Sequence, residues 1–228
     1  MAVLIDPDKQ TEQELQAFAK QLAKASVDFV FVGGSLLMAD RMKSCVQTLK
    51  SVLDIPVVIF PGNEIQIVPQ ADALLFLSLI SGRNPEMLIG KHVVSAPLLK
   101  QSHVEVIPTG YILIDGGRPT SVVYMSNTAP IPYDKNDIAA CTALAGEMLG
   151  LKLIYLEAGS GALHNVSSTM IQAVKQQISV PLIVGGGIRD VETARIVCEA
   201  GADVIVIGTA LERDVSKLQD FCQAVHRF

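Results

Sequence analysis

The stretch 182–209, LIVGGGIRDVETARIVCEAGADVIVIGT, contains the elements that decide the fold. Two short apolar runs, one at each end, enclose a segment with helical periodicity that begins after the capping residue Asp190. The first run ends in Gly185–Gly187, and the second ends in Gly208 and Thr209. The stretch therefore predicts a strand–helix–strand unit whose strands end in glycine-containing loops.

The same alternation continues over the rest of the chain. Apolar runs recur, and polar stretches with helical periodicity, such as Thr11–Ala25 and Val191–Ala200, lie between them. Because the runs are almost continuously apolar, they are typical of parallel strands that are covered on both faces. The predicted strands are Ala2–Ile5, Phe29–Val32, Pro56–Phe60, Leu74–Leu79, Tyr111–Ile114, Leu153–Leu156, Leu182–Val184 and Val204–Ile207.

These strands and helices predict one α/β domain over residues 1–228, a single (β/α)8 TIM barrel. An open doubly wound sheet is the alternative, but the G-x-G-x-x-G turn typical of that fold does not follow the first strand. One connection is unusually long, because the loop Asp115–Asp137 separates a strand from the next helix. Loops of this length are usually functional or disordered.

The composition is more apolar than is usual. Of 228 residues, 50% are hydrophobic and 18% are charged, against about 25% charged in typical domains. No apolar run approaches the ~20 residues that cross a bilayer, so we expect no integral membrane span. With a net charge of −5 and no basic run, we expect no nucleic-acid partner. The apolar surplus predicts a large core, an apolar ligand groove or a subunit interface in a homo-oligomer.

Cysteine usage and the N-terminus predict a cytoplasmic protein. Cys45, Cys141, Cys198 and Cys222 lie far apart and form no C-x-x-C pair. We therefore expect them to be small buried hydrophobic residues in a reducing compartment. The N-terminus begins on an apolar strand, without the basic and apolar regions of a signal peptide.

Glycines at the strand ends predict a phosphate site. In TIM barrels the loops after strands seven and eight, with a helix N-terminus, recurrently bind phosphate. Gly185–Gly187 and Gly208 with Thr209 lie at both positions, and Gly159-Ser160-Gly161 after strand six would extend the site. Glycine lets backbone N–H groups approach phosphate oxygens closely. The alternative is that these glycines only serve turns that need a positive φ.

A metal site is predicted after the first strand, in the segment Asp6-Pro7-Asp8-Lys9. Asp6 ends the strand, where its carboxylate could bind Mg²⁺ together with phosphate oxygens of a substrate. The alternative is a plain turn in which Asp8 caps the following helix. Ser35, after Gly33-Gly34, is either a weak hydroxyl ligand, a phosphate contact or a turn residue.

Glu157 is the candidate general base. It ends strand six, where a carboxylate in the barrel mouth needs either a partner or a chemical role. The alternative is a structural ion pair with Lys9 or Arg189. The four histidines do not group with Asp or Cys at ligand spacing, and we assign them no role.

Together the motifs resemble the geranylgeranylglyceryl phosphate synthase family, in its archaeal-like branch with bacterial relatives. The resemblance spans the whole chain, and the run Tyr155–Gly161 (YLEAGSG) is its most specific part. The other matching segments are 4–9 (LIDPDK), 32–35 (VGGS), 77–85 (LSLISGRNP), 108–111 (PTGY), 124–128 (YMSNT), 130–132 (PIP), 185–189 (GGGIR) and 208–210 (GTA). The long form of the segment Asp115–Asp137 is similar to the archaeal-like branch.

The resemblance implies a prenyltransferase. In this reaction the C3 hydroxyl of sn-glycerol 1-phosphate attacks C1 of geranylgeranyl diphosphate, and an ether and diphosphate form. Glu157 would take the proton, and Asp6 and Ser35 would hold Mg²⁺. The residues implied for glycerol 1-phosphate are Tyr155, Leu156, Glu157, Ala158, Gly159, Ser160, Gly161, Gly186, Gly187, Gly208 and Thr209.

Two other functions compete with this hypothesis. A sugar-phosphate isomerase or lyase would use the same glycine loops, but it would not explain the pair Asp6 and Ser35 or the apolar surplus. A non-catalytic carrier of polyprenyl phosphates is the second alternative.

Overall fold

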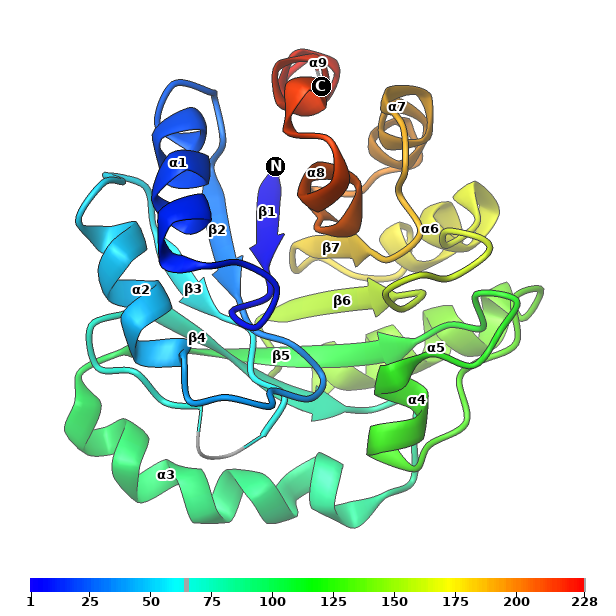
Figure 1. The fold of residues 1–228 in the computed structure, drawn as a ribbon. Coiled ribbons are helices and arrows are strands. Elements are labelled where there is room, and N and C mark those ends of the chain that lie inside the picture. Colours follow the sequence, from blue (N-terminus) through cyan, green and yellow to red (C-terminus); the bar gives the residue numbers. More distant parts are fainter. Residues whose placement is uncertain (64–65, 228) are drawn as a thin grey trace.

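The chain folds as a closed barrel of parallel strands in chain order, from β1 to β8 (Figure 1). The computed structural model describes residues 1–63 and 66–227. The barrel closes through the pairs Ala2↔Val206 and Val3↔Ile207, which join β1 to β8. The predicted TIM barrel is confirmed, and the open doubly wound sheet is excluded.

The strands coincide closely with the predicted apolar runs. They are β1 (Ala2–Ile5), β2 (Phe29–Val32), β3 (Val57–Ile59), β4 (Ala73–Leu79), β5 (Glu105–Leu113), β6 (Leu153–Glu157), β7 (Leu182–Gly185) and β8 (Val204–Ile207). The helices are α1 (Glu12–Leu22), α2 (Met42–Lys50), η1 (Glu86–Gly90), α3 (Lys91–Ser102), α4 (Ser121–Ser126), α5 (Asn136–Met148), α6 (Ser168–Lys175), α7 (Val191–Glu199), α8 (Thr209–Arg213), η2 (Val215–Lys217) and α9 (Leu218–Val225).

The strands are apolar on both faces because each face is buried in a different layer. Phe31, Leu75 and Tyr155 fill the barrel interior, whereas Val30 and Ile154 pack against the surrounding helices. Both layers exclude water, which explains why the strand sequences do not alternate between apolar and polar residues.

The two predicted capping residues begin their helices. The Thr11 hydroxyl accepts a hydrogen bond from the Glu14 backbone N–H, and the Glu14 carboxylate accepts one from the Thr11 N–H, which forms a capping box. The Asp190 carboxylate accepts a 2.8 Å hydrogen bond from the Thr193 N–H. Asp8 is not a helix cap, since its carboxylate instead accepts a hydrogen bond from the Met38 N–H.

Three segments differ from the prediction. β5 begins at Glu105 rather than Tyr111, because pairing with β4 from Ala73↔Glu105 onward outweighs the interruption by Pro108. The loop 115–137 contains α4, and Ile131 forms an isolated bridge with Ile114. Between β3 and β4, the described residues 60–63 and 66–72 form no helix.

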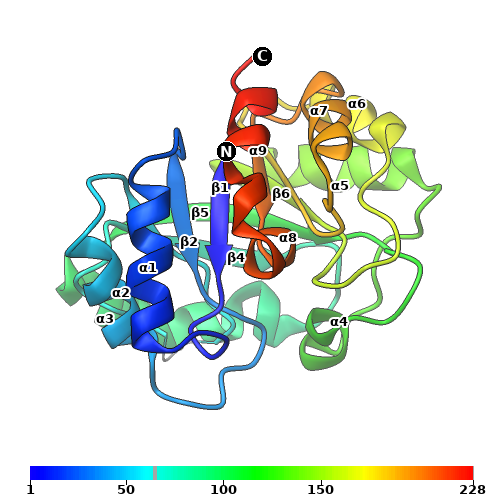
Figure 2. The same cartoon turned by 45° about the horizontal axis from the view of Figure 1, so that its top comes forward.

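The helices surround the barrel, and α8 lies beside β1 (Figures 1 and 2). The two ends of the chain are also close together, because Asp28 contacts both the Met1 ammonium and the His226 ring. No helix within the described residues has the length and apolarity needed to cross a membrane.

The cysteines are only partly as expected. All four are free; Cys45 and Cys222 are buried and Cys198 is partly buried. Cys141 is exposed on α5, so the expectation that it is buried was wrong. Its position on the outer face of the helix, and not its residue type, determines its exposure.

Candidate active site

The predicted site residues lie at the carboxyl ends of the strands, around the mouth of the barrel. Glu157 closes β6, Gly186 follows β7 and Gly208 follows β8. Asp6 follows β1, which pairs with β8 on one side and β2 on the other. Because the barrel is closed, Asp6 lies between the loop after β8 on one side and the loop after β2, which contains Ser35, on the other.

Glu157 is a buried carboxylate, with 6% of its surface exposed. Its Oε1 atom accepts a 2.6 Å hydrogen bond from the backbone N–H of Gly159. Burial raises the pKa of Glu157 to about 7, although the bond from Gly159 and the nearby hydroxyl of Tyr155 lower it. A carboxylate with a pKa near neutrality can accept a proton in one step and release it later.

The alternative role of Glu157, a structural ion pair, is excluded by the positions of both candidate partners. Lys9 contacts Asp6 and Glu212, at 3.7 Å and 2.9 Å. Arg189 donates a hydrogen bond to the carbonyl oxygen of Ala162. Glu157 is thus held by hydrogen bonding and burial, without a neutralising cation from either residue.

Tyr155 and Leu156 precede Glu157 on opposite faces of β6. Tyr155 is fully buried in the barrel interior, where its ring stacks on Phe60 at 5.4 Å and meets Tyr111 edge-on at 5.3 Å. Its hydroxyl lies beside Gly185 and has no hydrogen-bond partner of good geometry among the described residues. The Leu156 side chain packs in the helix layer, outside the barrel interior.

The glycine loops combine positive φ angles with close approach. Gly159 and Gly186 have φ angles of 94° and 82°, which side-chain-bearing residues rarely adopt. A Cβ atom on Gly186 would collide with the Glu157 carboxylate and the backbone of Ala158 and Gly159. Both glycines are therefore required by the turns, which was the alternative to a role in phosphate binding. Gly161 and Gly187 also have positive φ angles.

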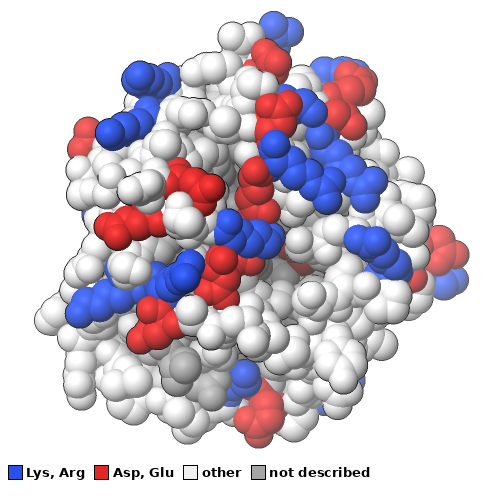
Figure 3. All heavy atoms as spheres, viewed as in Figure 1, with Lys and Arg blue, Asp and Glu red and all other residues white. Residues whose placement is uncertain are grey.

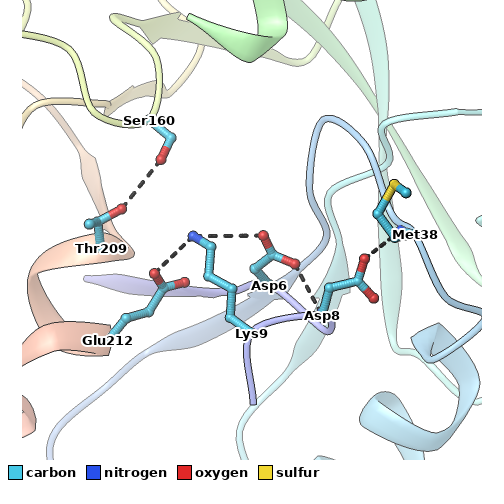
Figure 4. A network of polar contacts seen from close by, with 7 residues as sticks. All are labelled: Asp6, Asp8, Lys9, Met38, Ser160, Thr209 and Glu212. Carbon is cyan, nitrogen blue, oxygen red and sulfur yellow. Dashed lines mark hydrogen bonds and ion pairs between the residues drawn. The ribbon is translucent and has the colours of Figure 1, made fainter.

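Gly208 differs from these turn glycines. A Cβ atom there would meet only Leu4, at an ordinary contact distance of 3.4 Å, and its φ angle is negative. The next residue, Thr209, has its hydroxyl 3.3 Å from that of Ser160 (Figure 4). The loops after β6 and β8 therefore meet through two hydroxyl groups.

Two residues near these loops were missed by the sequence analysis. The guanidinium group of Arg118 lies against Gly161, and Thr120 lies against Gly159 with its buried hydroxyl unpartnered among the described residues. Both belong to the long connection after β5, whose length was the only sequence signal for them. They add a cation and a hydroxyl to the rim of the candidate phosphate site.

The metal candidates Asp6 and Ser35 come together through β1 and β2. The Asp6 carboxylate packs against Gly34, the residue before Ser35, and its Oδ1 accepts a 3.1 Å hydrogen bond from the Asp8 N–H. Within residues 1–63 and 66–227, no three His, Cys, Asp or Glu side chains form a metal-holding group. A carboxylate and a hydroxyl suit Mg²⁺, which usually takes few protein ligands and completes its shell with waters and phosphate oxygens. These residues therefore fit a magnesium ion that is shared with a substrate.

A cavity begins beside Ser35 and runs away from the glycine loops. Its lining extends from Gly34 and Ser35 past Phe60, Leu75, Phe76 and Tyr111 to His92, Ser95 and Leu99 of α3. Glu157 is not part of the lining, so the cavity and the glycine loops are separate regions, and the Asp6 carboxylate lies against the lining at Gly34.

His92 is a polar residue in this largely apolar wall, and no sequence pattern indicated its position. Its ring meets Phe76 edge-on at 4.4 Å, and its Nε2 lies 3.2 Å from the Ser78 hydroxyl. Burial lowers the pKa of His92, which favours the neutral ring. A neutral imidazole preserves the low polarity of the cavity.

Charge is distributed unevenly over this side of the molecule (Figure 3). Acidic and basic side chains are spread over the upper part and the middle of the face, while the lower region, over α3, is largely uncharged.

Comparisons with known proteins identify relatives of this chain. The chain is 56% identical over 225 residues to a geranylgeranylglyceryl phosphate synthase of Chitinophaga pinensis, covering 99% of this chain and 89% of that protein. It is 42% identical over 226 residues to one of Methanosphaera stadtmanae, covering 98% and 92%.

Solved structures give the same result. The chain matches (S)-3-O-geranylgeranylglyceryl phosphate synthase of Thermoplasma acidophilum, in complex with sn-glycerol-1-phosphate, with a TM-score of 0.94 and 36% identity over 100% of this chain and 93% of that one. Thiamine phosphate pyrophosphorylase of Pyrococcus furiosus shares only the fold, with a TM-score of 0.62 at 13% identity. The model described as the PcrB family matches residues 1–225, and with these identities it shows that the chain belongs to the PcrB family.

Proposed function

We propose that this protein is a geranylgeranylglyceryl phosphate synthase, which joins sn-glycerol 1-phosphate to geranylgeranyl diphosphate through an ether bond. The similarity to the Thermoplasma acidophilum enzyme in complex with sn-glycerol-1-phosphate is the observation that carries this proposal. The closeness of that match over the whole chain, together with the relatives that bear the same name, supports the same reaction here.

Glycerol 1-phosphate binds over β6, β7 and β8. Backbone N–H groups of Gly186, Gly187 and Gly208 and the hydroxyls of Ser160 and Thr209 supply donors for the phosphate oxygens. Because three of these residues are glycines, no bulky side chain blocks the approach of the phosphate to their N–H groups. Gly208 supports the assignment: the packing of the protein would leave room for a side chain there, so a bound phosphate is a reason for glycine at this position.

Glu157 acts as the general base. Its carboxylate takes the proton from the C3 hydroxyl, and the oxygen attacks C1 of the prenyl chain as the bond from C1 to the diphosphate oxygen breaks. The products are the ether and diphosphate, and the proton remains on Glu157 until it passes to solvent. A pKa of about 7 suits this role, because the group is then substantially ionised at neutral pH and still basic enough to accept a proton.

Asp6 and Ser35 would hold Mg²⁺, which neutralises charge on a departing diphosphate when it is bound. Asp6 lies between the glycine loops and the cavity, where the diphosphate of a prenyl substrate would have to lie if its chain enters the cavity. The short distance from a prenyl C1 to its own diphosphate then brings C1 between Asp6 and Glu157.

The cavity between β4 and α3 accepts the prenyl chain. Its walls are mainly aliphatic and aromatic, which suits an apolar ligand. This groove accounts for part of the apolar surplus of the sequence. It also distinguishes the proposal from a sugar-phosphate isomerase or lyase, whose polar substrate has no use for an apolar groove.

The second alternative, a non-catalytic carrier of polyprenyl phosphates, does not account for Glu157. Burying an ionisable carboxylate without a cation costs stability, and binding alone gives no reason to retain it. Catalysis of proton transfer gives such a reason.

We also propose that the protein is cytoplasmic and self-associates. Exposed apolar side chains on the outer face of α5, at Ile138 and Met148, with Leu149 just after the helix, support an interface between copies. The molar mass in solution, measured by light scattering over a concentration series, tests this part. A monomer at all concentrations would contradict it.

The decisive experiment for the reaction combines the protein with Mg²⁺, sn-glycerol 1-phosphate and radiolabelled geranylgeranyl diphosphate. We expect labelled geranylgeranylglyceryl phosphate and one equivalent of released diphosphate. Binding of the prenyl diphosphate without turnover would favour the carrier, and failure to bind it would refute both prenyl functions.

A further inference from the structure

Lys9 joins two carboxylates that belong to opposite ends of the chain. Its ammonium lies 2.9 Å from Oε2 of Glu212 in α8 and 3.7 Å from Oδ2 of Asp6 after β1 (Figure 4). The side chains of Asp6 and Glu212 are 22% and 15% exposed, whereas that of Lys9 is 46% exposed. The two acids are thus less exposed than the lysine that joins them.

The two oxygens of Asp6 have different surroundings. Oδ1 is occupied by the hydrogen bond from the Asp8 N–H, at 3.1 Å. Oδ2 packs against Gly34, beside Ser35, and faces the ammonium of Lys9. A metal ion that binds Asp6 through Oδ2 would therefore meet a positive charge already on that oxygen, and like charges at this separation repel each other.

Glu212 offers the ammonium a second acceptor. It lies in the same helix as Thr209, and its backbone N–H is bound to the carbonyl oxygen of Gly208 at 3.1 Å. The backbone of Glu212 is therefore fixed to the loop that follows β8, and its carboxylate makes the shorter of the two contacts with Lys9. Lys9 can leave Asp6 without losing its ion pair.

We propose that Lys9 is a positioning residue that exchanges with the divalent metal at Asp6, and that Glu212 holds its ammonium when the metal is bound. This inference rests on the proposed binding of Mg²⁺ by Asp6. Without metal, the ammonium neutralises Asp6. With metal, it remains paired to Glu212 at the boundary between the metal and phosphate regions, where a cation also favours the diphosphate.

The proposal predicts opposite effects for the two partners of one ion pair. Lys9→Met removes the competing charge, so Mn²⁺, as a spectroscopic substitute for Mg²⁺, should bind on the order of 5–10-fold more tightly. Glu212→Gln removes the negative charge that draws the ammonium away from Asp6, so Lys9 stays on Asp6 and Mn²⁺ should bind more weakly. If Lys9 merely fastened α8 to β1, both substitutions would loosen the site and weaken binding.

The experiment is a titration of the full-length protein with Mn²⁺ alone at low ionic strength, with free Mn²⁺ measured by electron paramagnetic resonance. Lys9→Arg keeps the charge and should behave as the wild type. Lys20→Met and Glu105→Gln make the same charge changes at exposed positions on α1 and at the start of β5, and should leave binding unchanged. The effect of Glu212→Gln should also shrink in the Lys9→Met background, because the ammonium that it controls is absent.

The results separate this inference from the proposed metal site. Loss of Mn²⁺ binding in Asp6→Asn, with equal affinities in the wild type, Lys9→Met and Glu212→Gln, would leave the metal site standing and refute the exchange. Weaker binding in Lys9→Met would refute it as well. If the wild type does not bind Mn²⁺, either alone or with inorganic diphosphate, and Lys9→Met does not bind it either, both the metal site and the exchange are refuted.

Discussion

The Oε1 atom of Glu157 accepts a 2.6 Å hydrogen bond from the backbone N–H of Gly159, two residues further along the chain. Gly159 has a φ angle of 94°, so the turn that directs this N–H at the carboxylate depends on glycine. The same turn begins the loop proposed to bind phosphate. One local conformation therefore orients the base and forms part of the substrate site.

Glu157→Gln should retain binding of both substrates and slow turnover by about 10²–10⁴-fold, the usual contribution of a general base. The amide keeps the shape and can still accept the Gly159 hydrogen bond through its oxygen, but it cannot take the proton. Single-turnover kinetics and calorimetric titration of each substrate separate chemistry from binding. An unchanged rate would show that the proton goes elsewhere.

The turnover number should rise with pH through a transition near 7. Burial raises the pKa of Glu157 to about 7, and only the ionised form, which is present above that pKa, can accept the proton. Activity is therefore lost as pH falls through this value. The phosphate substrate also ionises in this region, so Glu157→Gln is the control: its residual rate should lack the transition that belongs to the carboxylate. A pH profile identical in both proteins would contradict the assignment.

Gly208→Ala should raise the KM for glycerol 1-phosphate by about tenfold, equivalent to about 1.4 kcal/mol, and leave the thermal midpoint almost unchanged. A Cβ atom at this position makes only an ordinary contact with Leu4, so we expect the fold to tolerate it while the phosphate loses space. Steady-state kinetics and thermal unfolding provide the two readouts.

Gly150→Ala and Gly186→Ala are informative comparisons for Gly208→Ala. Gly150 has a positive φ angle but open space around it, so its substitution tests backbone strain away from the site. Gly186→Ala adds a collision with Glu157 and should also lower stability. An unchanged KM in Gly208→Ala would remove that residue from the phosphate site.

Asp6→Asn should raise the Mg²⁺ concentration needed for half-maximal activity, because an amide oxygen is a weaker ligand for a hard cation than a carboxylate. Activity measured over a Mg²⁺ series tests this directly. Since Asp6 also binds the Asp8 N–H, circular dichroism should show that the loop change does not unfold the protein. An unaltered Mg²⁺ dependence would place the metal elsewhere.

Ser95→Phe should shift prenyl specificity toward shorter chains. Ser95 is buried on α3 and lines the cavity, so a larger side chain there shortens the space available. We expect the ratio of kcat/KM for C20 over C10 diphosphates to fall by about tenfold or more. Ala96→Phe, on the exposed side of the same helix, is the matched control. An unchanged ratio would mean that the prenyl chain lies outside this cavity.

Much of the fold is predictable from local sequence. The apolar runs locate the strands within a few residues, and Thr11 and Asp190 begin their helices as their residue types indicate. β5 was predicted too short because Pro108 and Gly110 interrupt its pattern, whereas pairing with two neighbouring strands compensates for them in the barrel. The absence of a helix in the described residues between β3 and β4 had no local signal.

The candidate site, like the fold, was predictable only in part. Sequence by itself determined which residues end the strands, because strand length and glycine position are local properties, and so it identified Asp6, Glu157 and the glycine loops. The tertiary structure alone decided that Lys9 pairs with Glu212, that Arg118 lies on Gly161 and that His92 lines the cavity. These contacts join segments far apart in the chain. Burial and charge at the mouth depend on closure of the barrel, which no short stretch of sequence encodes.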